Sequence, residues 1–298
     1  MAAASSAPFI VSTAFSTNPF GGNPALVVFL DPATVPFKTL HGISLNFNQP
    51  MACFVKPFGA LEAGQTEIHT DIQFVPVTGK DVGLCGHGSL ASAKAILSLP
   101  EYKEKGIAAI HFRTVNNRGT ITVRVLGEDR LEVELPASPP VPVSSEAKER
   151  IADVVNRAFS REVKINSILE GGETFKHVVL IEIDKSENLE GSKIGKSIFG
   201  ETGYSVNVVT SDSDSTEVFA SRMFSNEVPG FEDHVCGSAH CLVVPYWYKK
   251  KEIEAGKEVL AKMASERSGW LNINYDTERG KVRLAGEAAL LSTGVCYF

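Results

Sequence analysis

The sequence has no long apolar run, no excess of positive charge and few cysteines. No apolar run approaches the ~20 residues that a helix needs to cross a bilayer. The 298 residues include 29 Lys or Arg and 35 Asp or Glu, which gives a formal net charge of -6. A mildly acidic surface suits neither nucleic-acid phosphates nor anionic lipids. We therefore expect a small-molecule substrate, with no nucleic acid and no membrane among the partners.

Several common functional signals are also missing. Residues 1–8 carry neither the positive charge nor the apolar segment of a secretory signal, so we expect a cytoplasmic protein. The sequence has no Walker loop, no Rossmann fingerprint and no G-x-S-x-G elbow. A nucleotide cofactor or a serine hydrolase is therefore unsupported, and we expect no cofactor.

The cysteines are too few and too scattered for a disulfide framework. They are Cys53, Cys85, Cys236, Cys241 and Cys296. An odd number spread over a chain of this size indicates free thiols.

Length and local composition predict two lobes. A single core rarely grows far beyond ~150 residues, and residues 136–143 contain four prolines without periodicity. We place an N-terminal lobe at 1–135, a linker at 136–146 and a C-terminal lobe at 147–298, with the option that the extreme C-terminal strand packs back on the N-terminal lobe.

The two halves follow a similar plan, which indicates an internal duplication. In the first half we expect strands at 9–15, 25–30, 52–55, 72–75 and three more within 107–135, with helices at 39–46 and 89–99. In the second half we expect helices at 145–159, 241–248 and 254–265, and strands at 164–170, 176–183, 204–209, 217–224, 269–275 and 280–286. In each half a loop ending in Cys-Gly precedes an apolar helix that should be buried.

A Cys-Gly immediately before a helix has a chemical use. The helix N-terminus presents unpaired N–H groups and a partial positive charge, which favour a thiolate and can hold a carboxylate. Two such turns, at Cys85-Gly86 and Cys236-Gly237, could hold a small acid and pass a proton across it, one thiolate removing a proton and the other thiol returning it. The competing interpretation is packing, since free cysteine is among the most buried residue types; Cys53, Cys241 and Cys296 are assigned to packing.

Polar residues near the turns extend the candidate site. His87 and His240 can act as acid or base or bind a carboxyl group, or they are core histidines satisfied by the backbone. Asp233 and Ser238 can hydrogen-bond a ligand or cap the helix. Zinc is discounted at these turns because the spacing of structural zinc sites is missing.

Four segments resemble the phenazine-biosynthesis isomerase (PhzF-like) family. They are Gly22-Asn23-Pro24-Ala25, residues 48–55, residues 84–91 beginning Leu84-Cys85-Gly86-His87, and residues 231–240 ending Cys236-Gly237-Ser238-Ala239-His240. The resemblance implies an α+β, diaminopimelate-epimerase-like fold: two similar lobes, each a curved, mostly antiparallel sheet wrapped around a central helix. It also implies cofactor-free chemistry in the cleft between the lobes and a homodimer. His87, Asp233 and Ser238 match the family's histidine, acidic residue and serine.

Two departures from the family pattern shape the functional hypotheses. Met51 stands where the family has its catalytic glutamate, so a glutamate-shuttled hydrogen shift is in doubt. Cys236 stands where family members commonly have threonine. The two cysteine turns thereby look similar to the paired cysteines of diaminopimelate epimerase and proline racemase, although Ala239 stands where those enzymes favour glycine.

Three functional hypotheses follow. The first is a cofactor-independent isomerase or epimerase that moves a proton on a small or medium-sized acidic metabolite. The second is a cyclase or pericyclase of a specialised biosynthetic pathway that acts by shape and hydrogen bonding. The third is a binding protein without catalysis. The candidate catalytic residues are Cys85, Cys236, His87 and Asp233, and the candidate substrate-binding residues are Gly86, Gly88, Ser89, Met51, Gly237, Ser238, His240 and Asn23; no metal ligands are assigned.

Overall fold

The chain forms two compact units. The computed structural model describes residues 5–80, 82–115 and 119–298. Unit 1 comprises Met1–Glu134 and Ala285–Phe298, and unit 2 comprises Leu135–Leu284. The last fourteen residues therefore belong to the first unit, although they follow the second in sequence.

Unit 1 is a sheet that closes on itself around a helix. Its elements are β1 (Ser6–Ala14), β2 (Asn23–Phe29), η1 (Pro32–Thr34), α1 (Phe37–Phe47), β3 (Met51–Val55), β4 (Glu67–Val75), α2 (Gly86–Leu97), β5 (Ala109–Thr114), β6 (Thr120–Val125), β7 (Arg130–Pro136) and the C-terminal part of β16 (Lys281–Tyr297). Strands β1 to β7 follow one another in the sheet, β16 comes next to β7, and β16 also pairs with β1. Closure removes the exposed strand edges that an open sheet would leave.

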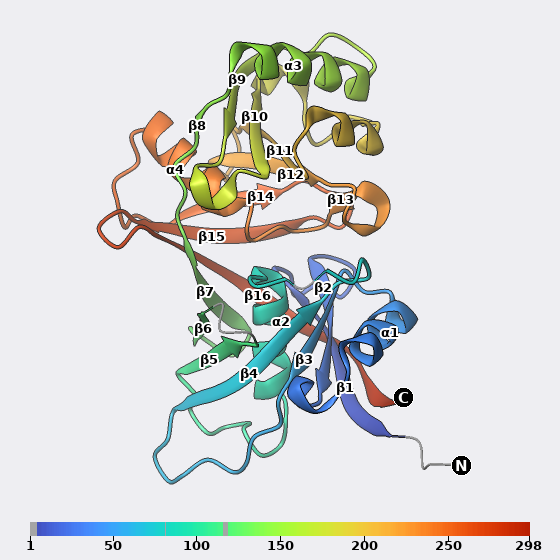
Figure 1. Cartoon of the computed structure of the whole chain (residues 1–298). Helices are drawn as coiled ribbons and strands as arrows, with labels where there is room; N and C mark the ends of the chain where they lie inside the picture. The colour runs from blue at the N-terminus through green and yellow to red at the C-terminus, as the bar shows by residue number, and fades with distance from the viewer. Residues whose placement is uncertain (1–4, 81, 116–118) are drawn as a thin grey trace. The chain divides into compact units, whose positions relative to one another are not determined.

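The enclosed helix α2 is rich in small residues, with Gly, Ala or Ser at seven of its twelve positions. It has the sequence GHGSLASAKAIL, and all but two of its twelve residues are buried. It packs against β1, β2, β3 and β6 (Figure 1). Gly, Ala and Ser leave room for strands on several sides of the helix, whereas larger side chains would force the closed sheet apart.

The outer face of β1–β3 is covered by α1. Leu40 and Ile43 of α1 pack against Leu26, Val28 and Phe54 of the strands beneath. Alternation along each strand thus sends one set of side chains toward α2 and the other toward α1.

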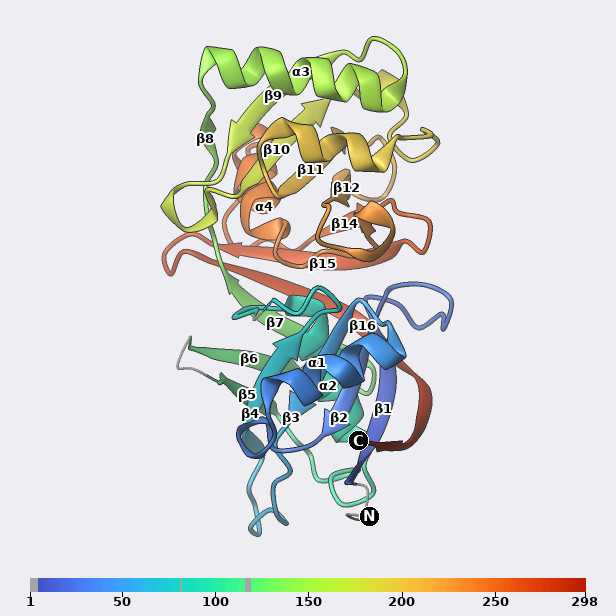
Figure 2. The ribbon, with the colours of Figure 1, turned by 45° about the vertical axis from the view of Figure 1, so that its right-hand side comes forward.

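Unit 2 also combines a sheet with a buried central helix, which carries larger side chains than α2. Its elements are β8 (Val141–Pro142), α3 (Ser145–Phe159), β9 (Ile165–Glu170), η2 (Glu173–Phe175), β10 (Val178–Ile183), η3 (Lys185–Glu187), η4 (Lys196–Thr202), β11 (Val206–Asp212), β12 (Phe219–Phe224), η5 (Pro229–Phe231), β13 (Glu232–Asp233), α4 (His240–Lys250), β14 (Val259–Met263), β15 (Gly269–Asp276) and the beginning of β16. Helices α3 and η4 pack on one face of β9–β12 (Figure 2). Helix α4 is buried along most of its length, with Trp247 fully enclosed.

The pairing directions confirm the internal duplication. In unit 1, β1–β2 is antiparallel, β2–β3 parallel, β3–β4 antiparallel, β4–β5 parallel and β5–β6 antiparallel. In unit 2, the pairs β9–β10, β10–β11, β11–β12, β12–β14 and β14–β15 repeat that order of directions. The central helix lies between the fourth and fifth strands of both series: α2 between β4 and β5, α4 between β12 and β14. The expected α+β fold with two similar lobes is therefore confirmed.

One local expectation was wrong. The helix expected at 254–265 is a turn followed by strand β14. Gly256 has a left-handed backbone (φ 81°), and Ala261 and Met263 alternate with more exposed neighbours, which is the period of a strand. Residues 136–146 lie within unit 2, where Val141 and Pro142 pair with β9 and α3 begins at Ser145. Within the described residues, no helix has both the length and the apolarity required to cross a membrane.

The tight enclosure of α2 can be tested at Gly88. A Cβ added there would lie 2.9 Å from Cys53 Sγ, 3.0 Å from Cys85 Sγ and 3.2 Å from a ring carbon of Phe74. We expect Gly88→Ala to lower the free energy of unfolding by about 1–3 kcal/mol through overpacking, as measured by urea unfolding.

Gly42 provides the matched control. It lies inside α1, and a Cβ built there has no neighbour within 4 Å. Gly42→Ala should raise stability by about 0.5–1 kcal/mol through helix propensity alone. Equal effects of the two substitutions would contradict a tightly enclosed α2.

Candidate active site

The first cysteine turn is built into the N-terminus of α2. Cys85 is the N-cap residue, with an extended backbone, and its Sγ accepts a hydrogen bond from the Gly88 N–H at 3.4 Å. The thiol thus takes the place that a serine or aspartate oxygen usually occupies at a helix start. Its sulfur lies where the helix dipole is most positive.

A histidine lies beside this thiol. His87 Nδ1 is 3.5 Å from Cys85 Sγ, and both side chains are buried. A cysteine in contact with an imidazole at a helix N-terminus can pass its proton to the ring and react as a thiolate. The geometry therefore supports proton acceptance at Cys85.

Hydrogen bonds from buried serine side chains hold the backbone of this turn. Ser89 Oγ donates to the Cys85 carbonyl at 2.7 Å, and Ser12 Oγ donates to the Ala91 carbonyl at 2.8 Å. Cys53 Sγ lies 3.6 Å from the Gly88 carbonyl. Ser89 has no exposed surface, so its hydroxyl positions Cys85; a contact with substrate stays untested.

Met51 and Asn23 lie at the same edge of the sheet as this turn. Strand β2 begins at Asn23 and the parallel β3 at Met51, where the antiparallel β4 ends before the chain turns toward α2. Met51 is two residues from Cys53, so both side chains point to the same face of β3. Because Cys53 touches the first turn of α2, Met51 projects beyond the start of the helix.

The second cysteine turn follows β13 in unit 2. Asp233 pairs with Met223 of β12, and the adjacent Glu232 is fixed by two hydrogen bonds from Arg222, at 2.6 and 2.9 Å. Burial alone would raise the pKa of Glu232, but the ion pairs with Arg222 and Lys196 lower it. This buried network fixes the strand from which the loop to Cys236 starts.

Cys236 is held as a thiol. Burial, together with the negative charge of Asp233, raises the pKa of the Cys236 thiol to about 12. The sulfur also lies 3.4 Å from Ser238 Oγ. Desolvation outweighs the partial charge of the helix terminus here, so Cys236 carries its proton at neutral pH.

His240 supports the backbone of the second turn. Its Nδ1 lies 2.8 Å from the Cys236 carbonyl, and its side chain has no exposed surface. Burial lowers the pKa of the imidazole to about 4. The ring is therefore neutral at physiological pH and donates from Nδ1, so its visible role is positioning; substrate binding by His240 stays untested.

The two turns share one plan of hydrogen bonds. In each, the sulfur receives the N–H of the residue three positions later, from Gly88 to Cys85 and from Ala239 to Cys236. In each, the side chain four positions later holds the cysteine carbonyl. This likeness in hydrogen bonding is independent of the sequence likeness.

The predicted site residues thus fall into two groups. Unit 1 gathers Asn23, Met51, Cys85, Gly86, His87, Gly88 and Ser89, and unit 2 gathers Asp233, Cys236, Gly237, Ser238 and His240. All five cysteines are free. Sequence reasoning missed the contact of Cys53 with α2, although its two-residue spacing from Met51 was a usable signal.

Comparison with known proteins places the chain in a family. The family described as Phenazine biosynthesis-like protein (PhzC-PhzF) matches residues 12–294. The chain belongs to this family. An uncharacterized isomerase of Halalkalibacterium halodurans is 31% identical over 282 residues, covering 94% of this chain and 95% of the relative. The human phenazine biosynthesis-like domain-containing protein is 25% identical over 316 residues, covering 96% and 98%.

Solved structures agree with the fold. A PhzF-family protein of Enterococcus faecalis has a TM-score of 0.78 at 23% identity, covering 99% of this chain and 100% of that chain. A hydroxyproline epimerase of Agrobacterium vitis, solved with bound trans-4-hydroxy-L-proline, has a TM-score of 0.56 at 10% identity, covering 98% and 93%. The family and its named relatives support an isomerase-type enzyme. The cytoplasmic location and the homodimer stay predictions.

The buried neutral His240 gives a testable pH dependence. Its pKa is about 4 in the folded protein against an ordinary value of 6.5 for histidine, so between these values the unfolded chain binds a proton that the folded chain does not. Stability must therefore fall as pH drops from about 6.5 to 4, by about 3 kcal/mol from this residue. Urea unfolding across this range measures the slope.

His240→Asn is the informative variant, because the asparagine amide can still donate to the Cys236 carbonyl. Its absolute stability will be lower, but its loss of stability between pH 6.5 and 4 should be smaller than that of the parent protein. A slope identical to the parent's would show that His240 is not the titrating group.

Proposed function

We propose that this protein is a cofactor-independent isomerase or epimerase that uses its two cysteine turns to move a proton on a small or medium-sized acidic metabolite. The observation that carries the proposal is the repeated turn, in which a buried cysteine leads into each central helix with the same hydrogen bonds around it, Cys85 as the N-cap of α2 and Cys236 four residues before α4 begins. Two such groups suffice for a reaction in which one removes a proton and the other supplies one.

Cys236 is the proposed proton donor. The Asp233 carboxylate and burial keep its thiol protonated, so the proton is present when substrate arrives. Donation forms a C–H bond at the substrate carbon and leaves a thiolate, whose proton is restored from solvent.

Cys85 is the proposed proton acceptor. Transfer of its proton to His87, whose Nδ1 lies 3.5 Å away, leaves a thiolate at the positive end of α2. That thiolate takes the proton from substrate carbon while Cys236 supplies another, so the substrate gains and loses one proton.

An acidic substrate fits the electrostatics of the turns. Backbone N–H groups at a helix start favour a carboxylate, and a carboxylate next to the reacting carbon helps to accept the charge that forms when the proton leaves. The hydroxyproline epimerase with the same fold was solved with a carboxylic imino acid, which makes amino and imino acids the first class to examine.

Solvent exchange tests the proposal. The full-length protein is incubated in D₂O with a panel of L-amino and imino acids, including trans-4-hydroxy-L-proline, and loss of the α-proton signal is followed by ¹H NMR. We expect deuterium uptake at the α-carbon of at least one compound, falling at least about 100-fold in Cys85→Ser and in Cys236→Ser, because a hydroxyl is a far poorer acid and base at neutral pH.

Cys296→Ser is the matched control. Cys296 Sγ donates to the Ala7 carbonyl at 3.3 Å, a bond that a serine hydroxyl can also make, and the residue lies in the core beneath α1. Exchange should be unchanged in this variant. Full exchange in both turn variants would reject the cysteine mechanism, and binding without exchange by any compound would favour a binding protein.

A cyclase or pericyclase is the second candidate, favoured by one observation. Met51, where the family has a glutamate, is buried and apolar at the edge of the sheet, and the neighbouring Cys53 also contributes an uncharged thiol, since burial raises its pKa to about 12. Such an enzyme would keep its activity in both cysteine variants, lose it in His87→Ala, and form product without solvent label.

A further inference from the structure

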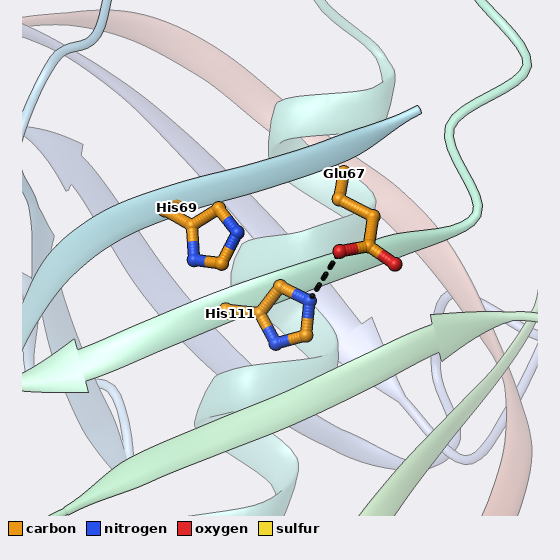
Figure 3. A group of neighbouring side chains, drawn as sticks. All are labelled: Glu67, His69 and His111. Atoms are coloured by element: carbon orange, nitrogen blue, oxygen red, sulfur yellow. Dashed lines mark ion pairs between the residues drawn. The ribbon is translucent and has the colours of Figure 1, made fainter. Parts of the chain in front are cut away.

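Three metal-ligating side chains meet on the outer face of unit 1, on strands unconnected with the cysteine turns. Glu67 and His69 lie two residues apart on β4, and His111 lies directly beside His69 on the parallel strand β5. Alternation points all three side chains to the same face, as Figure 3 shows. His111 is more than 40 positions from the other two residues in sequence, and only the strand register brings it beside them.

The ligand atoms are close enough to share one ion. One nitrogen or oxygen from each of the three side chains lies within 4.8 Å of the other two. His111 Nε2 is 3.4 Å from Glu67 Oε2, and the two imidazole rings are stacked with their centres 4.5 Å apart. Ligand atoms at ~2.0–2.2 Å from one zinc ion can be at most about 4.4 Å apart. A small rotation of the partly exposed side chains therefore completes the set.

A hydrogen bond to the neighbouring strand β6 already fixes the orientation of the His111 ring. Its Nδ1 lies 3.0 Å from the hydroxyl of Thr122, the residue opposite it on β6. A ligating histidine typically has its second ring nitrogen hydrogen-bonded, which sets the tautomer and turns the first nitrogen toward the metal. Here that leaves Nε2, the nitrogen on the side of Glu67, for the ion.

The face is open to solvent on the side where the ion would bind. Both histidines line a surface hollow of about 390 Å³ that also includes Lys56, Asp71 and Arg113. Asp71 accepts two hydrogen bonds from Arg113, at 2.6 and 2.9 Å, and this arginine lowers the pKa of the Asp71 carboxyl. Asp71 is thus already paired with Arg113 and is not counted among the ligands. The ion would keep a water molecule at its remaining coordination position.

We propose that Glu67, His69 and His111 form a binding site for a divalent transition-metal ion, with Zn²⁺ as the best match. Two imidazole nitrogens and one carboxylate oxygen, with one position left for water, are a common donor set for zinc. Mg²⁺ and Ca²⁺ prefer all-oxygen sites and are poorly served here. The site lies outside the cysteine turns and is independent of the proposed isomerisation.

Isothermal titration of tag-free, metal-stripped, full-length protein with ZnCl₂ at pH 7.5 tests the proposal. We expect one Zn²⁺ per chain, with affinity falling at least about tenfold in His69→Ala and in His111→Ala, since each removes a direct ligand. Co²⁺ should give the visible absorption of a four- or five-coordinate ion, and this should disappear in the same variants.

His177→Ala is the matched control, since His177 is an exposed histidine of unit 2 that the site does not use. Zinc should also raise the melting temperature of the parent protein, because an ion that binds only the folded state stabilises it, and should not raise that of His111→Ala. Unchanged affinity in both histidine variants would overturn the proposal. So would binding that vanishes only when the cysteines are alkylated, because the ion would then belong to the thiols.

Discussion

The turn that leads into each central helix depends on one cysteine, whose sulfur and carbonyl are both held by residues three and four positions later. The sulfur receives the N–H of Gly88 or Ala239, and the carbonyl receives Ser89 or His240. These bonds fix the direction of each thiol before any substrate is present. The buried helices and the strands around them hold these turns in place, and preorganised groups of this kind are what proton transfer requires.

The two turns are alike in hydrogen bonding but differ in the titratable side chain nearest the sulfur. Cys85 has a histidine beside its sulfur, whereas Cys236 has a carboxylate nearby that raises its pKa. This asymmetry suits a donor and an acceptor better than two equivalent thiolates would. This pair of thiols would also replace the glutamate that the family resemblance leads us to expect at the place of Met51. One thiol would remove the proton and the other would return one, two steps that a single carboxylate would otherwise perform.

The fold could be predicted from the sequence largely because two Cys-Gly turns, each before an apolar helix, exposed the duplication, and family resemblance supplied the sheet around each helix. The strand at 259–263 was missed because charged residues around Gly256 resemble an exposed helix. Local sequence could not show that β16 would close the sheet of unit 1, since its pairing with β1 joins opposite ends of the chain. The raised pKa of Cys236 depends on burial, and the group of Glu67, His69 and His111 depends on register, neither of which spacing alone reveals.

The central claim is that the two thiols act in one proton transfer, and a double-variant cycle tests it most directly. Solvent deuterium uptake is measured for the parent protein, Cys85→Ser, Cys236→Ser and the double variant, using a compound that exchanges in the parent. Groups that act as a unit show strongly non-additive losses, so the account predicts that the double variant exchanges about as slowly as the slower single variant. Losses that multiply in the double variant would show that the two cysteines contribute independently and would contradict the account.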